Sequence, residues 1–316
     1  MTAIAARISH SSSARSDIVP VIAQFVRGFS IEATRPTREE VAAFAGIAES
    51  STRVYVSAVS TRPPQDVIEA AIRLRAAGFQ AVPHVAVRMF ATAGALDDFL
   101  TRLAGETAVE HVLIVAGDRD QPAGTFRSAI ELIDGGALQR HGIKEIGIAG
   151  YPEGHPRISQ QELDRALADK IAAAEATGIK VHIVTQFCFD VAAILRWISR
   201  LRDFGLEHPV RIGLAGPTDL AALLRYARRC GVRASAPGLA RKSGLLRQLF
   251  TMSAPDAPIE ALAQAHAGRR LGVVKPHFFS FGGLLRTARW ASAVADGRIT
   301  LETDEGFRVE PAAVMR

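Results

Sequence analysis

The chain is poor in cysteine and in aromatic residues, and each shortage excludes a class of protein. It has only two cysteines, Cys188 and Cys230, so no disulfide framework can form and a reducing, cytoplasmic location is expected. Aromatic residues make up 6% of the chain, and the arginines are spread over predicted helical faces. Because no basic patch is interleaved with stacking rings, we expect no nucleic-acid partner despite a net charge of +6.

Long apolar runs and the common short catalytic motifs are also missing. No run of 18 apolar residues occurs, so no membrane span is expected. Residues 1–16 lack the apolar segment of a signal peptide, and we expect a disordered leader there. No C-x-x-C, H-E-x-x-H, G-x-S-x-G or Walker motif is present, and no metal site is expected. What remains is acid–base chemistry or chemistry on a bound organic cofactor.

The chain does contain a regular alternation of short apolar segments and amphipathic segments. Strands are predicted at Phe29–Ala33, Val54–Val59, Ala81–Val87, His111–Gly117, Lys144–Gly150, Lys180–Phe187, Val210–Ala215 and His277–Phe281. Helices are predicted at Asp17–Arg27, Thr37–Glu49, Pro64–Ala77, Ala95–Leu103, Thr125–Gln139, Ser159–Ala176, Ala192–Phe204, Thr218–Arg229, Gly238–Met252, Ile259–Ala267 and from Leu284 onward. Eight such repeats predict an α/β protein of the (β/α)8 TIM barrel type.

This barrel is expected to span residues 17–296, with an N-terminal extension and extra helices before the eighth strand. Residues 297–316 would form a C-terminal tail, either a small hairpin or a loose end. An open dinucleotide-binding sheet is disfavoured, because the turn after the first strand reads A-T-R-P and lacks the expected glycines.

Polar side chains occur where the predicted strands end, and in a barrel these ends meet at one mouth. They are Glu32, Ser57, Ser60, His84, Asp118, Tyr151, His155, Gln186 and Ser280. Glu32 lies between Ile31 and Ala33, where it is either exposed at a frayed end or buried with a raised pKa that suits a proton donor. Asp118 is either part of a surface turn or a second carboxylate of the site.

Five of the motifs that carry these residues occur together. They are I-E-A-T-R-P at 31–36, Pro83-His84, Gly117-Asp118, Y-P-E-G-H-P at 151–156 and T-Q-F-C-F-D at 185–190. In this order the set resembles the methylenetetrahydrofolate reductases, a family of flavin-dependent barrel enzymes. The resemblance implies an oxidoreductase that interconverts 5,10-methylenetetrahydrofolate and 5-methyltetrahydrofolate in one-carbon metabolism.

The resemblance also implies a role for each site residue. Glu32 would be the catalytic proton donor, and Asp118 would lie beside both the pterin and the flavin. The residues implied to bind FAD are His84, Asp118, Tyr151, His155, Ser60 and Lys170. Those implied to bind tetrahydrofolate derivatives are Gln186, Glu32 and Asp118. NADH or NADPH would be the second cofactor, and a homo-oligomer is left open.

The chain departs from the family pattern at Ala116, where an arginine usually precedes Gly-Asp, and at Ala33-Thr34, where an aromatic pair is usual. These departures suggest altered flavin binding or work in the methyl-oxidising direction. The alternatives are a flavin-free enzyme dependent on NAD(P)H, a folate-dependent methyltransferase on the same barrel, and a non-catalytic folate-binding protein.

Overall fold

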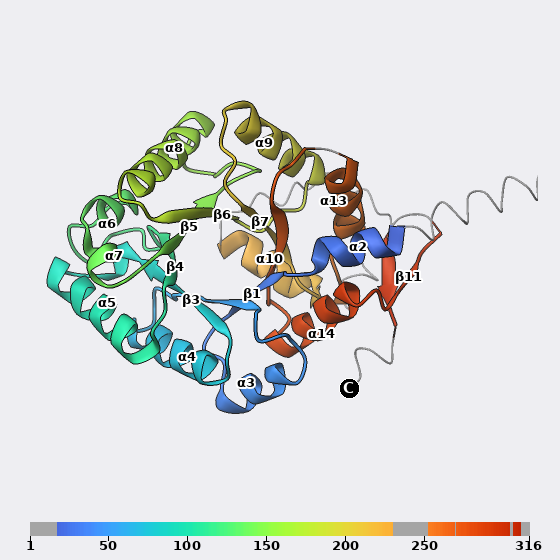
Figure 1. Ribbon diagram of the computed structural model, residues 1–316, viewed down its shortest axis with the longest axis horizontal. Helices are drawn as coiled ribbons and strands as arrows, with labels where there is room; N and C mark the ends of the chain where they lie inside the picture. The colour runs from blue at the N-terminus through green and yellow to red at the C-terminus, as the bar shows by residue number, and fades with distance from the viewer. Residues whose placement is uncertain (1–17, 230–251, 269, 304–305, 311–316) are drawn as a thin grey trace, which may run out of the picture.

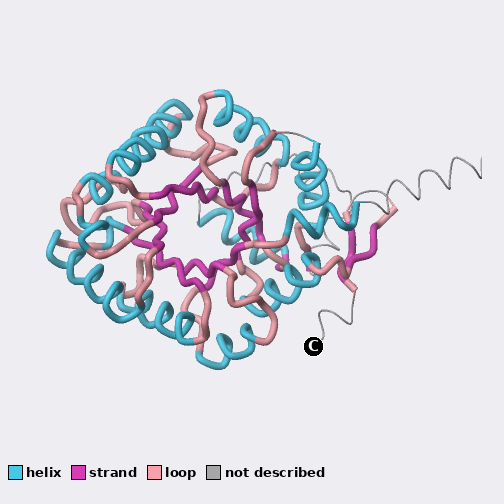
Figure 2. The backbone as a smooth tube through the Cα atoms, viewed as in Figure 1, coloured by secondary structure: helices cyan, strands magenta, loops and turns pink. Residues whose placement is uncertain are grey.

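The computed structural model describes residues 18–229, 252–268, 270–303 and 306–310 of the 316 in the chain. The leader predicted over residues 1–16 lies outside these ranges. So does the helix predicted over Gly238–Met252, apart from its last residue. The described residues form a ring of strands enclosed by helices (Figures 1 and 2).

Eight parallel strands close into a barrel in the order β1-β10-β7-β6-β5-β4-β3-β2. The ring is completed by β10, which pairs with both β1 and β7. The predicted (β/α)8 TIM barrel is therefore confirmed. Its strands are β1 (Ser30–Ala33), β2 (Arg53–Val56), β3 (Gln80–Ala86), β4 (His111–Val115), β5 (Glu145–Gly150), β6 (Lys180–Thr185), β7 (Val210–Ala215) and β10 (Val274–Phe279).

The helices surround the barrel, with α2 packed against α13 and α14, except for α10, which lies across the ring of strands in the view of Figure 1. They are α2 (Ile18–Val26), α3 (Arg38–Ala45), α4 (Gln65–Ala76), the 3-10 turn η1 (Val87–Met89), α5 (Ala93–Thr107), α6 (Ile130–Asp134), α7 (Ala137–Arg140), α8 (Gln160–Ala176), α9 (Val191–Asp203), α10 (Leu220–Arg229), α13 (Asp256–Gly268) and α14 (Leu284–Ala295).

Two helix starts follow from capping boxes that are visible in the sequence. The hydroxyl of Thr37 accepts from the backbone N–H of Glu40, and the Glu40 carboxylate accepts from the backbone N–H of Thr37. Ser159 and Glu162 make the same reciprocal pair at the start of α8. Each box satisfies amide groups that the first turn of a helix leaves without partners.

The bounds of several predicted elements differ from the structure, and three of these differences have a clear cause or consequence. The helix predicted over Thr125–Gln139 is instead two short helices, α6 and α7, separated at Gly135-Gly136, because Gly136 adopts a positive φ of 66°. The helix predicted from Thr218 starts two residues later, since β8 (Thr218–Asp219) pairs with β9 (Met252–Ser253). The eighth barrel strand begins three residues before the predicted His277.

The core has two parts, one on each side of the strands. The larger part lies between the strands and the helices and includes Ile31, Ile146 and Trp197. The smaller part fills the barrel interior and consists of Tyr55, Val82, Leu113 and Val184. Burying a side chain of this size contributes about 1.5–3 kcal/mol, so the outer part supplies most of the stabilisation.

After α14 the chain forms an antiparallel hairpin of β11 (Ile299–Leu301) and β12 (Phe307–Val309). The buried ring of Phe307 stacks on Trp290, with ring centroids 6.1 Å apart. None of the helices in the described ranges has the length and apolarity needed to cross a membrane.

Gly150, at the end of β5, lies against Trp197 of α9. A Cβ at this position would lie 2.8 Å from the Trp197 ring and 2.9 Å from Ile183. We expect Gly150→Ala to lower the free energy of unfolding by about 1–3 kcal/mol, because overpacking a core forces its neighbours to shift. Urea denaturation of the purified variant measures this change.

Gly105→Ala is the matched control, since Gly105 lies within α5 and a Cβ there would have no atom within 4 Å. It should raise the free energy of unfolding by roughly 0.5–1 kcal/mol through helix propensity. Wild-type stability in Gly150→Ala would contradict the tight packing of β5 against α9.

Candidate active site

Four polar side chains from neighbouring strands meet at the C-terminal end of the barrel. They are Glu32 of β1, Ser57 after β2, His84 of β3 and His277 of β10, and we call them the Glu32 cluster. These strands are consecutive in the ring, in the order β10, β1, β2, β3. Because side chains alternate along a strand, one set from each strand points into the barrel, and the mutual contacts of these residues place them in that set.

The Glu32 carboxylate lies at the centre of this cluster. Its Oε2 accepts a hydrogen bond from Ser57 Oγ at 2.8 Å. Its Oε1 lies 3.4 Å from His84 Nε2 and 3.6 Å from His277 Nε2. The side chains of Glu32 and His84 are 13% and 12% exposed, and that of His277 is fully buried. A carboxylate and two imidazoles therefore share a space that is largely closed to solvent.

The pKa of Glu32 is lowered, which contradicts the alternative of a buried carboxyl with a raised value. Burial raises this pKa, but His84, His277 and the Ser57 hydroxyl together lower it by more. The expected apolar surround is absent because Ile31 and Ala33 point away from the barrel interior and pack in the outer core. Burial also lowers the pKa of both imidazoles. The neighbours of Glu32 therefore favour its ionised form, while burial opposes a charge on the two imidazoles.

His277 is fixed by two further contacts within the barrel. Its Nδ1 lies 2.9 Å from Ser30 Oγ, and its ring meets the Tyr55 ring edge-on at a centroid distance of 4.7 Å. In the described part of the chain, Nε2 of neither His277 nor His84 makes a hydrogen bond. Both nitrogens are therefore available to Glu32 or to a bound molecule. Sequence reasoning did not single out His277, because the predicted strand began at this residue instead of carrying it in its middle.

The predicted cofactor residues Ser60, Asp118 and Tyr151 lie on the loops after β2, β4 and β5, and side-chain contacts connect these loops to one another. Arg119, in the loop after β4, donates from Nη1 to the Ser60 carbonyl in the loop after β2 at 3.5 Å. Asp120, next along the same loop, pairs with Arg157 of the β5 loop at 2.8 Å. The loops after β2, β4 and β5 are thus connected around this side of the mouth.

Three of the predicted residues lie on the β4 and β5 loops of this side. The rings of Tyr151 and His155 meet edge-to-face at a centroid distance of 5.5 Å. Burial and the nearby Arg157 lower the pKa of His155, in that order. Asp118 is exposed at the start of the β4 loop. These side chains present a phenol, an imidazole and a carboxylate on adjacent loops.

Among the described residues, no hydrogen bond or ion pair joins Gln186 or Lys170 to the Glu32 cluster. Gln186 follows β6, and its Oε1 accepts from the backbone N–H of the adjacent Phe187 at 3.0 Å. In the described part of the chain, its side-chain nitrogen has no acceptor. Lys170 lies on α8, where burial lowers its pKa, and no hydrogen bond or ion pair within the described ranges joins it to the site loops.

A second polar network fills the barrel interior nearer its N-terminal end, and sequence reasoning missed it. Tyr55 Oη lies 2.7 Å from His182 Nε2, and His182 Nδ1 lies 2.7 Å from Glu145 Oε1. Arg53 donates to both Glu145 oxygens, at 2.6 and 3.1 Å. The sequence signal for this network was the alternation of side-chain direction along a strand. Each of these residues occupies an inward-facing position in an otherwise apolar strand.

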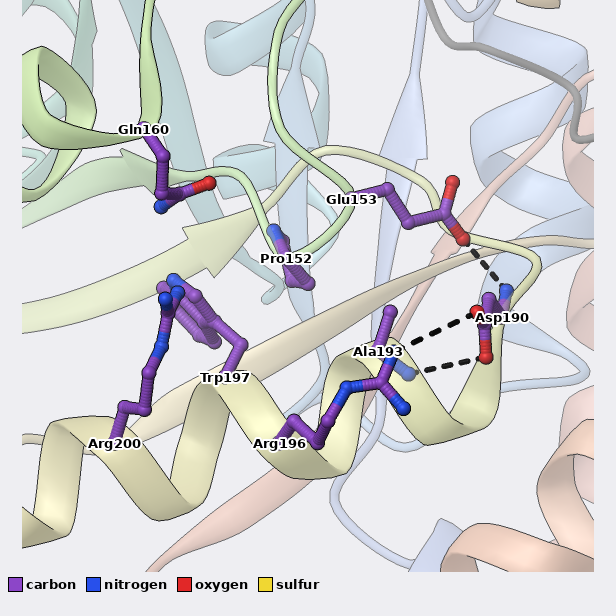
Figure 3. Close-up of a pocket in the computed structure, with 8 residues that line it drawn as sticks. All are labelled: Pro152, Glu153, Gln160, Asp190, Ala193, Arg196, Trp197 and Arg200. Atoms are coloured by element: carbon purple, nitrogen blue, oxygen red, sulfur yellow. Dashed lines mark hydrogen bonds and ion pairs between the residues drawn. The ribbon is translucent and has the colours of Figure 1, made fainter.

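A cavity of about 480 Å³ lies beside the Y-P-E motif, between the β5 loop and α9 (Figure 3). Glu153 on its wall accepts from the backbone N–H groups of Phe189 and Asp190, each at 2.6 Å. Asp190 in turn caps α9 by accepting from Ala193 N at 3.0 Å. Glu153 and Asp190, the acidic residues of the Y-P-E-G-H-P and T-Q-F-C-F-D motifs, therefore hold the β6 loop and the start of α9 in place. None of the predicted site residues lines this cavity.

Comparison with known proteins identifies relatives. A family model described as methylenetetrahydrofolate reductase matches residues 56–238, more than half of the chain. Methylenetetrahydrofolate reductase 2 of Saccharomyces cerevisiae is 30% identical over 140 residues, covering 42% of this chain and 23% of the yeast protein. The 5,10-methylenetetrahydrofolate reductase of Pectobacterium carotovorum is 29% identical over 130 residues, covering 40% and 41%. The matched segment thus spans less than half of either relative.

A solved structure supports the fold. An uncharacterised protein of Clostridium thermocellum, described as binding two copies of 5-methyl-5,6,7,8-tetrahydrofolic acid, superposes with a TM-score of 0.54. The superposition covers 87% of this chain and 95% of that protein at 14% sequence identity. At this identity, the likeness shows that the two chains share the barrel architecture.

Stability should fall between pH 6.5 and pH 4 because His182 is buried without charge. Desolvation lowers its pKa to about 4, against the pull of Glu145, whereas an unfolded histidine titrates near 6.5. In this window the unfolded chain binds a proton that the folded chain does not, so the free energy of unfolding falls as the pH falls. The loss from this group is on the order of 3 kcal/mol across the whole window.

Urea denaturation at pH 7, 6 and 5 at constant ionic strength measures the slope. His182→Gln should flatten it, while Asp98→Asn, at an exposed position of α5, should leave it unchanged. An equal slope in wild type and His182→Gln would contradict a buried neutral imidazole.

Proposed function

Because the chain belongs to the methylenetetrahydrofolate reductase family, we propose that it interconverts 5,10-methylene- and 5-methyltetrahydrofolate, with Glu32 carrying the proton. The observation that carries this proposal is the Glu32 cluster, a carboxylate held by Ser57, His84 and His277 at the C-terminal mouth. Active sites of (β/α)8 enzymes lie at this end of the barrel. The names of the yeast and Pectobacterium relatives support the same reaction.

Glu32 is proposed to work as a base in the methyl-oxidising direction. A C–H bond of the N5-methyl group breaks and its electron pair leaves as hydride, which gives an N5-iminium. N10 attacks the iminium carbon to close the methylene bridge, and the N10 proton passes to the Glu32 carboxylate. With its pKa lowered, the resting Glu32 is ionised, which is the protonation state that this step requires.

The neighbours of Glu32 would hold the carboxylate in place before and after proton transfer. Ser57 fixes one oxygen through a 2.8 Å hydrogen bond, which leaves the other to face the substrate nitrogen. His84 and His277 flank that second oxygen and can take up the proton from it. In the reverse direction the same proton returns to N10 from Glu32, since both directions share one transition state.

A bound flavin would supply the hydride chemistry. The loops after β2, β4 and β5 fit such a group, because Ser60, Asp118, Tyr151 and His155 offer a hydroxyl, a carboxylate, a phenol and an imidazole on adjacent loops. Hydroxyls and phosphates of a dinucleotide need both acceptors and donors of this kind. NADH or NADPH would exchange electrons with the flavin.

Arg119 is proposed to supply the cation that the family usually has one residue before Gly-Asp, at Ala116 here. The structure places the Arg119 guanidinium at the Ser60 carbonyl, on the same loops as the proposed flavin contacts. A guanidinium there could bind a flavin phosphate through paired N–H groups.

Gln186 and Asp118 are proposed as pterin contacts, because the Gln186 amide has donors to spare and Asp118 is exposed at the mouth.

The flavin assignment predicts a yellow protein. Purified protein that is incubated with FAD and then desalted should keep the visible absorbance of a flavin. Arg119→Gln should weaken FAD affinity by roughly tenfold, because a charge-assisted contact is lost. Arg102→Gln, on the outer helix α5, is the matched control. A colourless wild-type protein after FAD addition would refute the flavin and favour a flavin-free hydride transfer or a methyltransferase.

The proton role predicts that Glu32→Gln loses turnover while keeping its ligands. We expect kcat to fall by about 10²- to 10⁴-fold in both directions, because general acid–base catalysis contributes this much. Steady-state rates and binding of 5-methyltetrahydrofolate test the two parts separately, with exposed Glu49→Gln as control. Oxidation no faster than reduction in the wild type would exclude the methyl-oxidising assignment. Full activity in Glu32→Gln would exclude the proton role.

A further inference from the structure

A second cavity, of about 550 Å³, opens at the N-terminal end of the barrel. We call it the lower cavity. Its polar walls come from the first residues of the strands and the segments before them: Arg53, Glu145, Lys180, His182, His208 and Arg211. The Glu32 cluster lies toward the other end of the barrel, and none of its residues lines the lower cavity.

Positive charge exceeds negative charge around the lower cavity. Arg53, Lys180 and Arg211 line it with fixed positive charges. The inward carboxylate is that of Glu145, and both of its oxygens already accept from Arg53. The second carboxylate, Glu175, lies at the rim and is occupied by His208, whose Nε2 is 3.2 Å away. Each carboxylate thus already has a basic partner, and no ion pair in the described part of the chain joins either one to Arg211 or Lys180.

Arg211 is the clearest sign that a negative partner is missing. Within the described part of the chain, its guanidinium makes one hydrogen bond, to the Gly28 carbonyl at 3.4 Å, and no ion pair. Its direct cross-strand neighbour on β10 is another cation, Lys275. Burial lowers the pKa of Arg211 and Arg53 lowers it further, and together they outweigh Tyr55 and Glu145, which raise it. Like charges placed opposite each other destabilise a sheet unless something neutralises them.

The remaining cations of this end do not relieve the excess. Lys275 donates to the carbonyls of Gln24 and Phe25 near the C-terminal end of α2. Lys180 is exposed at the start of β6, and its ammonium makes no hydrogen bond or ion pair within the described ranges. His208 keeps one further buried nitrogen, Nδ1, that has no partner there. Donors thus outnumber acceptors around the cavity.

We propose that the lower cavity binds an anion of the phosphate class, held by Arg211 and Lys180 with Arg53 behind them. A guanidinium fork matches the oxygen geometry of phosphate, and an ammonium adds a movable point charge. The cavity is larger than a bare phosphate ion, so a phosphorylated small molecule would also fit. The anion would offset the repulsion between Arg211 and its cationic neighbours, so binding should stabilise the fold.

Isothermal titration with inorganic phosphate tests the site, using the full chain loaded with FAD and sodium chloride to hold the ionic strength constant. We expect one phosphate per chain and a melting temperature that rises with phosphate but not with chloride. Arg211→Gln should weaken binding by at least roughly tenfold. It should be as stable as the wild type without phosphate, because it removes an uncompensated charge. Lys180→Gln, at an exposed position, should weaken binding by a smaller factor.

Two controls separate this site from others. Arg165→Gln, on the exposed face of α8, should leave phosphate binding unchanged. Arg119→Gln tests the flavin loops at the opposite end of the barrel. Loss of phosphate binding in Arg119→Gln with wild-type binding in Arg211→Gln would overturn the proposal. Equal stabilisation by phosphate and chloride would overturn it as well.

Discussion

The closed barrel brings ionisable side chains into an interior where each must find a partner. A buried polar group without a hydrogen bond costs about 1–3 kcal/mol, and an unpaired charge costs more. Tyr55 shows how this constraint is met, because its hydroxyl reaches His182 while its ring edge contacts His277. Burial raises the pKa of Tyr55, so it remains a neutral divider between the network below it and the Glu32 cluster above. Tyr55 thus separates the two ends of the barrel sterically, although the charge of Arg211 still lowers the pKa of His277.

The architecture could be read from the sequence because it depends on local signals that repeat. Eight apolar segments separated by helices leave few arrangements other than a closed parallel barrel, and the capping residues Thr37 and Ser159 mark helix starts directly. Helix breaks were harder to predict. The pair Gly135-Gly136 lies in a segment of helical composition, and only the positive φ of Gly136 shows that the helix ends there.

The site was only partly readable, for a different physical reason. Glu32 and His84 were both found, because each is a polar residue in an apolar strand. The contact between Glu32 and His84 was not predicted. It depends on β1 and β3 lying on either side of β2, with both side chains pointing into the barrel. The alternative of a raised Glu32 pKa failed for the same reason. Neighbours in sequence, Ile31 and Ala33, face the helices, whereas the neighbours that set the charge lie on other strands.

Packing explains how a barrel this narrow can hold so many large polar rings. His182 occupies room that a side chain on the neighbouring strand β5 would need, because a Cβ at Gly147 would lie 2.8 Å from His182 Nε2. The apolar run I-G-I-A-G therefore serves two purposes. Its isoleucines build the outer core, while its inward positions are kept small enough to admit an imidazole. A larger residue at position 147 would displace His182 and leave Glu145 and Tyr55 without their shared partner. Sequence segments that look purely structural thus decide which charges the interior can contain.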